Sequence, residues 1–97
     1  MLNPEPSADL RRVARRMVWF KSPVETLADP VLFLSHVMTC GTVDDLRVVR
    51  AHFTDDQLRQ TLRTGLPGVF DARSWAYWHA VLGVDPVPPL PARRLPG

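Results

Sequence analysis

The chain has 97 residues, of which 45% are hydrophobic and 23% are charged, and its formal net charge is +2 at pH 7. This balance predicts one folded domain and excludes a disordered chain, because the apolar fraction is high enough to form a core. The lone cysteine, Cys40, excludes an internal disulfide and a thiolate metal site within the chain. No apolar run approaches the roughly 20 residues of a membrane span, so no membrane partner is expected. A reducing cytoplasm is the simplest location for a chain with this cysteine content.

After residues 1–7, which contain two prolines, the sequence predicts a first helix over about residues 8–18, which Ser7 could cap. Apolar side chains repeat on one face of this helix: Leu10, Val13, Ala14 and Met17. Four basic side chains occupy the opposite face: Arg11, Arg12, Arg15 and Arg16. Such a face is either solvated or forms a contact for phosphate or for an acidic partner surface, and both interpretations remain open.

Residues that can cap a first helical turn precede each of the next predicted helices: Ser22, Asp29, Thr42 and Thr54. The first of these helices is short, since Pro30 follows soon after it. The second runs to about Cys40 and ends at Gly41. Five of its side chains share the face expected to be buried, namely Phe33, Leu34, Val37, Met38 and Cys40, and Ser35 and Thr39 face away. The helix that Thr54 begins ends at Gly65.

The stretch from Phe70 to Gly83 holds two of the three tryptophans and the one tyrosine. Asp71 is a good N-cap and Gly83 a good C-terminal stop for a helix between them. One face of this helix is apolar: Trp75, Trp78 and Leu82. We expect it to be the helix on which the others pack. The opposite face carries side chains that are typical interface anchors, which makes them candidates for partner binding: Arg73, Tyr77 and Val81.

Residues 84–97 contain five of the ten prolines, a density that no helix interior tolerates. We expect an extended, polyproline-like tail that lies against its own domain or stays mobile. The predicted fold is therefore all-α, a small bundle of about five short helices with an extended Pro-rich C-terminal tail. The expected divisions are a basic N-terminal extension or helix at 1–16, a helical domain at 17–84 and the tail at 85–97.

No set of side chains in the sequence has the spacing of a catalytic site, so we expect no enzyme activity, no cofactor and no metal. Glycine-rich loops of the kind that cradle phosphates are absent. His36 and Cys40 have a usable metal-ligand spacing on one helix, but a zinc site needs three or four protein ligands. The aspartate pairs at 44–45 and 55–56 stand in first helical turns, where capping accounts for them.

The two short helices joined around Phe53 and Thr54 also permit a helix-turn-helix interpretation. Five polar side chains of the second helix could reach base edges: Gln57, Arg59, Gln60, Arg63 and Thr64. Against it, the linker is shorter than the usual three to four residues, and Asp55 and Asp56 would face the DNA phosphates. A small DNA-binding transcriptional regulator is therefore the alternative function.

Two segments, Phe33–Arg47 and Ser74–Gly83, resemble a family of small helical prokaryotic proteins. The similarity covers about residues 17–84, and six positions carry it: Gly41, Asp45, Leu46, Trp78, Leu82 and Gly83. Cys40 departs from the pattern, where an aromatic residue is commoner. Members of this family are often encoded beside nucleotidyltransferase-fold toxins of the AbiEii/MenT kind, which implies an antitoxin role.

An antitoxin of this kind needs no active site, but it needs a compact scaffold with an exposed aromatic and charged surface. The resemblance implies neutralisation of the toxin by direct contact between the two proteins. The arginines of the first helix would face the toxin's catalytic carboxylates, or the aspartates would face its basic rim, and the sequence does not choose between these. The two functions are compatible, since antitoxins often repress their own operon, and the oligomeric state stays open.

Overall fold

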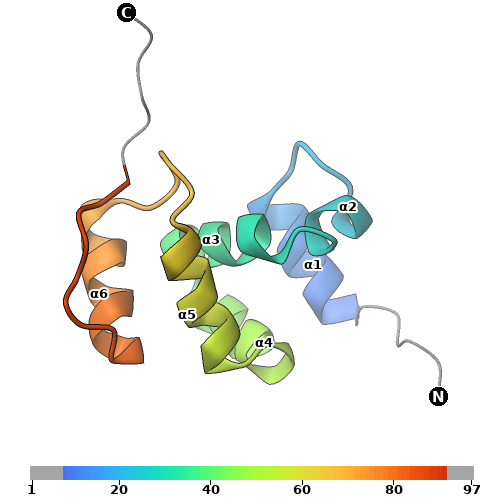
Figure 1. Ribbon diagram of the computed structural model, residues 1–97. Helices are drawn as coiled ribbons and strands as arrows, with labels where there is room; N and C mark the ends of the chain where they lie inside the picture. The colour runs from blue at the N-terminus through green and yellow to red at the C-terminus, as the bar shows by residue number, and fades with distance from the viewer. Residues whose placement is uncertain (1–7, 92–97) are drawn as a thin grey trace, which may run out of the picture.

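The computed structural model describes residues 8–91, which contain six helices and no strand. The helices are α1 (Ala8–Met17), α2 (Pro23–Leu27), α3 (Pro30–Cys40), α4 (Val43–His52), α5 (Asp55–Thr64) and α6 (Ala72–Leu82). The prediction of an all-α fold is confirmed, with one helix more than the five expected (Figure 1). None of the helices in residues 8–91 is both long enough and apolar enough to cross a membrane.

The helix starts follow from local capping chemistry. The sixth predicted cap, Ser7, lies outside the described residues. The other five accept a hydrogen bond from the backbone N–H three residues later, which satisfies a donor that has no partner inside the helix: Ser22, Asp29, Thr42, Thr54 and Asp71. Proline stands at the start of α2 and α3, where its missing N–H costs nothing. Local sequence alone therefore determines where these five helices begin.

Helix α3 is the centre of the bundle, and it packs against each of the other five helices. The expectation that α6 holds this place is wrong, because α6 packs mainly on α3 and α5. The cause is that α3 is buried on more than one side, since Ser35, which was expected to face away, is buried. The expectation for Cys40 is wrong in the other direction, because this last residue of α3 is exposed. A helix that is apolar on one side only, as α6 is, can cover a core but cannot form its centre.

Helix α1 contributes its apolar face to the same core. Leu10, Val13 and Ala14 are buried, and α1 packs on α2, α3 and α4. The boundary expected between residues 16 and 17 thus falls inside α1, a helix that packs on the bundle. Residues 1–7 lie outside the described part of the chain.

The first part of the proline-rich tail lies against the domain, in the place that Figure 1 shows beside α6. Three hydrogen bonds hold it within residues 8–91. The Val84 N–H donates to the carbonyl oxygen of His79 at 2.9 Å, the indole N–H of Trp75 donates to that of Pro88 at 2.8 Å, and the Gly68 N–H donates to that of Pro91 at 3.5 Å. We call residues 84–91 the proline strap. Residues 92–97 of the predicted tail lie outside the described residues.

Candidate interaction surfaces

A surface hollow of about 320 Å³ lies between the end of α3, the start of α4 and α6. We call it the α6 groove. Its lining is mostly apolar, with one guanidinium and two hydroxyl groups: Met38, Gly41, Leu46, Arg73, Ser74, Tyr77 and Trp78. Two of the three partner-binding residues predicted on α6, Arg73 and Tyr77, therefore line one concave surface.

The floor of the α6 groove is held in place by contacts between α3 and α6. The indole N–H of Trp78 donates to the carbonyl oxygen of Met38 at 2.7 Å, and the Trp78 side chain is buried. The hydroxyl of Ser74 approaches the carbonyl oxygen of Thr39 at 3.5 Å. A Cβ added at Gly41 would lie 2.5 Å from the carbonyl oxygen of Val37, so only glycine fits the turn between α3 and α4.

The rim of the α6 groove is open to solvent. Tyr77 is 57% exposed, and its ring stands edge-on to that of Trp78 with the ring centres 5.3 Å apart. Arg73 is exposed and lies beside the α6 cap. Val81, also exposed, lies one turn beyond Tyr77 and outside the groove lining. An apolar floor beside a phenol and a guanidinium can accept an apolar side chain and bind an acceptor group next to it.

The four arginines of α1 divide into two kinds. Arg12 pairs with Asp9 at 3.2 Å on the surface, and Arg16 pairs with the carboxylate of Asp45 in α4. Arg11 and Arg15 are exposed and have no hydrogen-bond or ion-pair partner within residues 8–91. None of the four lines the α6 groove, so the seven predicted binding residues do not form one site.

Asp45 is a buried carboxylate with three donors around it. Burial works to raise the pKa of Asp45, but hydrogen bonds from the Thr42 N–H, the Arg16 guanidinium and the Thr42 hydroxyl together bring it below the usual value. The carboxylate also completes a capping box with Thr42 at the start of α4. Arg16 therefore serves the fold by tying α1 to α4, which reduces its availability to a partner.

A second exposed apolar surface was not identified from the sequence. Trp19 is 81% exposed, Phe20 56% and Val24 70%. We call Trp19 and Phe20, which connect α1 to α2, the aromatic turn; their rings are perpendicular with centres 5.7 Å apart. The available signal is positional: α1 ends at Met17 and Ser22 caps α2, so both aromatic residues fall in a linker.

The side chains proposed to read DNA from α5 are partly used inside the protein. The side chain of Gln57 accepts the Thr54 N–H in the helix cap, and Arg59 donates to the carbonyl oxygen of Leu82 at 2.9 Å. The hydroxyl of Thr64 donates to a carbonyl of its own helix. Gln60 and Arg63 remain exposed. Helix α5 thus offers two of the five side chains for base contacts.

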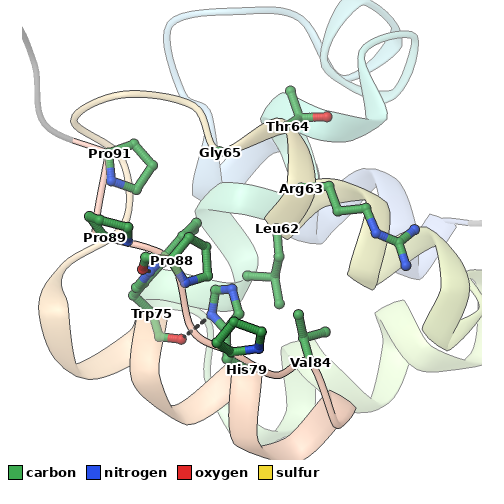
Figure 2. A pocket seen from close by; sticks show the side chains of 11 residues that line it. Leu62, Arg63, Thr64, Gly65, Trp75, His79, Val84, Pro88, Pro89 and Pro91 are labelled. Carbon is green, nitrogen blue, oxygen red and sulfur yellow. Dashed lines mark hydrogen bonds between the residues drawn. The ribbon is translucent and has the colours of Figure 1, made fainter.

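A further hollow of about 270 Å³ lies beneath the proline strap, between α5 and α6. Figure 2 shows Leu62, Trp75, His79 and Val84 around it with the prolines of the strap across it. His79 is buried, its Nδ1 lies 2.7 Å from the Trp75 carbonyl oxygen, and its ring centre lies 4.4 Å from that of Trp75. Within residues 8–91 no three His, Cys, Asp or Glu side chains gather as a metal ion would require.

Comparison with protein-family models, with curated proteins and with solved structures finds no match to this chain. A function is therefore inferred from the surfaces themselves. Three of these are open to a partner: the α6 groove, the aromatic turn and the unpaired arginines of α1.

Proposed function

We propose that this protein is an antitoxin-like binding protein, without enzymatic activity, that neutralises a nucleotidyltransferase-fold toxin in the cytoplasm by direct contact. The observation that carries the proposal is the α6 groove. It combines a fixed apolar floor with an exposed tyrosine and an exposed arginine, and its lining holds no carboxylate and no histidine. This composition suits the recognition of another protein.

The groove favours a protein partner because of the side chains on its rim. Tyrosine and arginine are enriched among the residues that dominate binding energy at interfaces. Tyr77 is packed edge-on against the buried Trp78, so little side-chain freedom is lost when a partner covers it. We expect an apolar side chain of the toxin to enter between Tyr77 and Leu46, with a toxin carboxylate or carbonyl at Arg73.

The experiment is co-purification with the protein encoded next to the gene, which the proposal requires to be a nucleotidyltransferase, together with rescue of growth when both are expressed. The variant Arg73→Ala with Tyr77→Ala should keep the helix content and weaken the complex by about tenfold or more, since interface anchors cost at least about 1–2 kcal/mol when truncated. The matched control is Arg47→Ala, an exposed arginine of α4 outside the groove. Separate elution of the two wild-type proteins, with growth still arrested, would end the proposal.

The alternative of a DNA-binding regulator has its own test. Gln60 and Arg63 are exposed on α5, so a promoter fragment that binds there should be released by salt, and Gln60→Ala with Arg63→Ala should abolish the shift. A shift that persists in this variant but is lost in Arg11→Gln with Arg15→Gln would place the contact on α1. No shift at low salt would remove the alternative.

A further inference from the structure

The aromatic turn and the unpaired arginines of α1 are adjacent along the chain. Arg11 and Arg15 stand one helical turn apart, about 6 Å along the axis, and Arg15 lies four residues before Trp19. Lys21 follows on the other side of the turn, and Val24 is exposed beside it in α2. Along the chain, the exposed indole of Trp19 thus stands between exposed cationic residues, Arg15 before it and Lys21 after it.

Internal pairing explains which cations remain for a partner. Arg12 is held by Asp9 and Arg16 by Asp45, and these two arginines form a helical row separate from that of Arg11 and Arg15. The carboxylate of Glu25 in α2 accepts hydrogen bonds from the N–H and the hydroxyl of Ser22. Arg11, Arg15 and Lys21 are therefore the basic side chains of this segment that have no hydrogen-bond or ion-pair partner within residues 8–91 and stay available to an anionic ligand.

We propose that this surface binds single-stranded nucleic acid, with a base stacked on Trp19 and the adjoining phosphates held by Arg11 and Arg15. Single strands offer what the surface can receive: a free base face for an aromatic ring and a phosphate chain for cations. A duplex hides its base faces in the stack. A bilayer requires a long apolar face, whereas this surface presents two aromatic rings and one valine.

The tryptophans make the test direct, because Trp75 and Trp78 are 4% and 3% exposed and Trp19 is 81% exposed. A base stacked on Trp19 should quench the fluorescence of this exposed indole, which is also the fluorescence that acrylamide in solution quenches. The fluorescence of the buried Trp75 and Trp78 should be unaffected. The probe is fluorescein-labelled oligothymidylate about 16 nucleotides long, the upper range of single-strand sites. Its anisotropy should rise at chain concentrations of about 10⁻⁶ to 10⁻⁴ M in low salt.

The salt dependence of binding and the loss of affinity in the variants can both be predicted in size. Two to three phosphate contacts predict a slope of about −1.4 to −2.1 in log K against log salt, since each contributes about −0.7. Arg15→Gln should reduce the slope by about 0.7, whereas Arg47→Gln on α4 should leave it unchanged. Trp19→Ala should weaken binding about fivefold or more, and Trp19→Phe should recover most of the loss.

The outcomes that overturn the proposal are distinct. No anisotropy change at about 10⁻⁴ M chain in low salt would exclude a nucleic-acid surface. Equal binding by Trp19→Ala would show that charge alone attracts the oligonucleotide. Preference for duplex of the same length, or for vesicles containing phosphatidylglycerol over the oligonucleotide, would assign the surface to another partner. All the variants concern exposed side chains, so circular dichroism should show unchanged helix content.

Discussion

The guanidinium of Arg16 in α1 donates to the carboxylate of Asp45 in α4, across 29 positions of the chain. The same carboxylate accepts the Thr42 N–H at 2.9 Å, and so one buried group both caps α4 and fixes α1 against it. Asp45 is 3% exposed, whereas the neighbouring Asp44 side chain is 87% exposed. The two aspartates of this pair therefore have different roles.

This difference predicts unequal costs of substitution. Asp45→Ala removes a buried partner of Arg16 and half of the capping box, and should lower the free energy of unfolding by about 2–4 kcal/mol. Asp44→Ala removes only a surface ion pair with Arg47 and should change it by less than about 0.5 kcal/mol. Urea denaturation of the two variants measures both. Equal effects would show that the Arg16–Asp45 pair does not tie α1 to the bundle.

The stability of the protein should fall at acid pH, because three of its carboxyl groups have a lowered pKa in the folded state. Hydrogen bonds from Ser22 to Glu25 and from Ser74 to Asp71 lower the pKa of these two exposed carboxyl groups. For Asp45, burial acts to raise the pKa, but hydrogen bonds from Thr42 and Arg16 outweigh burial, and the pKa is lowered. Such groups stabilise the fold above their unfolded pKa, and the stabilisation is lost as the pH falls through the folded pKa.

We therefore expect the free energy of unfolding to be nearly constant near neutral pH and to fall as the pH drops below about 4.5, the upper of the ordinary values for these groups. In Asp45→Asn the acid slope should be shallower, because one of the three groups no longer titrates. Urea unfolding at a series of pH values measures the slope. An identical acid slope in the variant would contradict the assignment to Asp45.

Gly41 and Gly83 should respond differently to the same substitutions. Gly41 has an ordinary extended φ, and alanine there would bring Cβ to 2.5 Å from a backbone oxygen of Val37, at a cost of about 1–3 kcal/mol. Gly83 has φ +68° and open space around it, so alanine should cost about 1 kcal/mol and asparagine less, since asparagine tolerates the left-handed region. Thermal unfolding of the four variants tests this; asparagine should rescue position 83 only.

How much of the fold is predictable from the sequence depends on how local each feature is. The helix caps depend on residues three positions apart, and the five predicted caps that fall within residues 8–91 are confirmed. The central place of α3 depends on how six helices share one core, and the tryptophans of α6 suggested a different centre. The exposure of Trp19 is equally non-local, since only the packed structure shows that its side chain stays exposed beside the helices of residues 8–91.

The candidate site divides in the same way. Helical periodicity placed Arg73 and Tyr77 opposite the buried tryptophans, but only the tertiary structure brings Met38 and Leu46 beside them to form a groove. On α1, helical periodicity predicts only that the four arginines share one exposed face. The structure distinguishes them because the partner of Arg16 lies in a different helix.

The proline strap should stabilise the bundle through Trp75. Its residues lie across the hollow that contains His79, and Pro88 accepts the indole N–H of Trp75 (Figure 2). Truncation after Asp85 removes this acceptor and exposes apolar surface of Trp75, so the free energy of unfolding should fall by about 1–3 kcal/mol. Truncation after Pro91 keeps the strap and is the matched control.

Two indole N–H groups, those of Trp75 and Trp78, are hydrogen-bonded to carbonyl oxygens, whereas Trp19 is exposed. In nuclear magnetic resonance spectra, two indole protons should therefore exchange slowly in the intact chain and one rapidly; after truncation at Asp85 only the Trp78 proton should remain protected. Two protected indole protons in the shorter chain would mean that the strap does not hold Trp75.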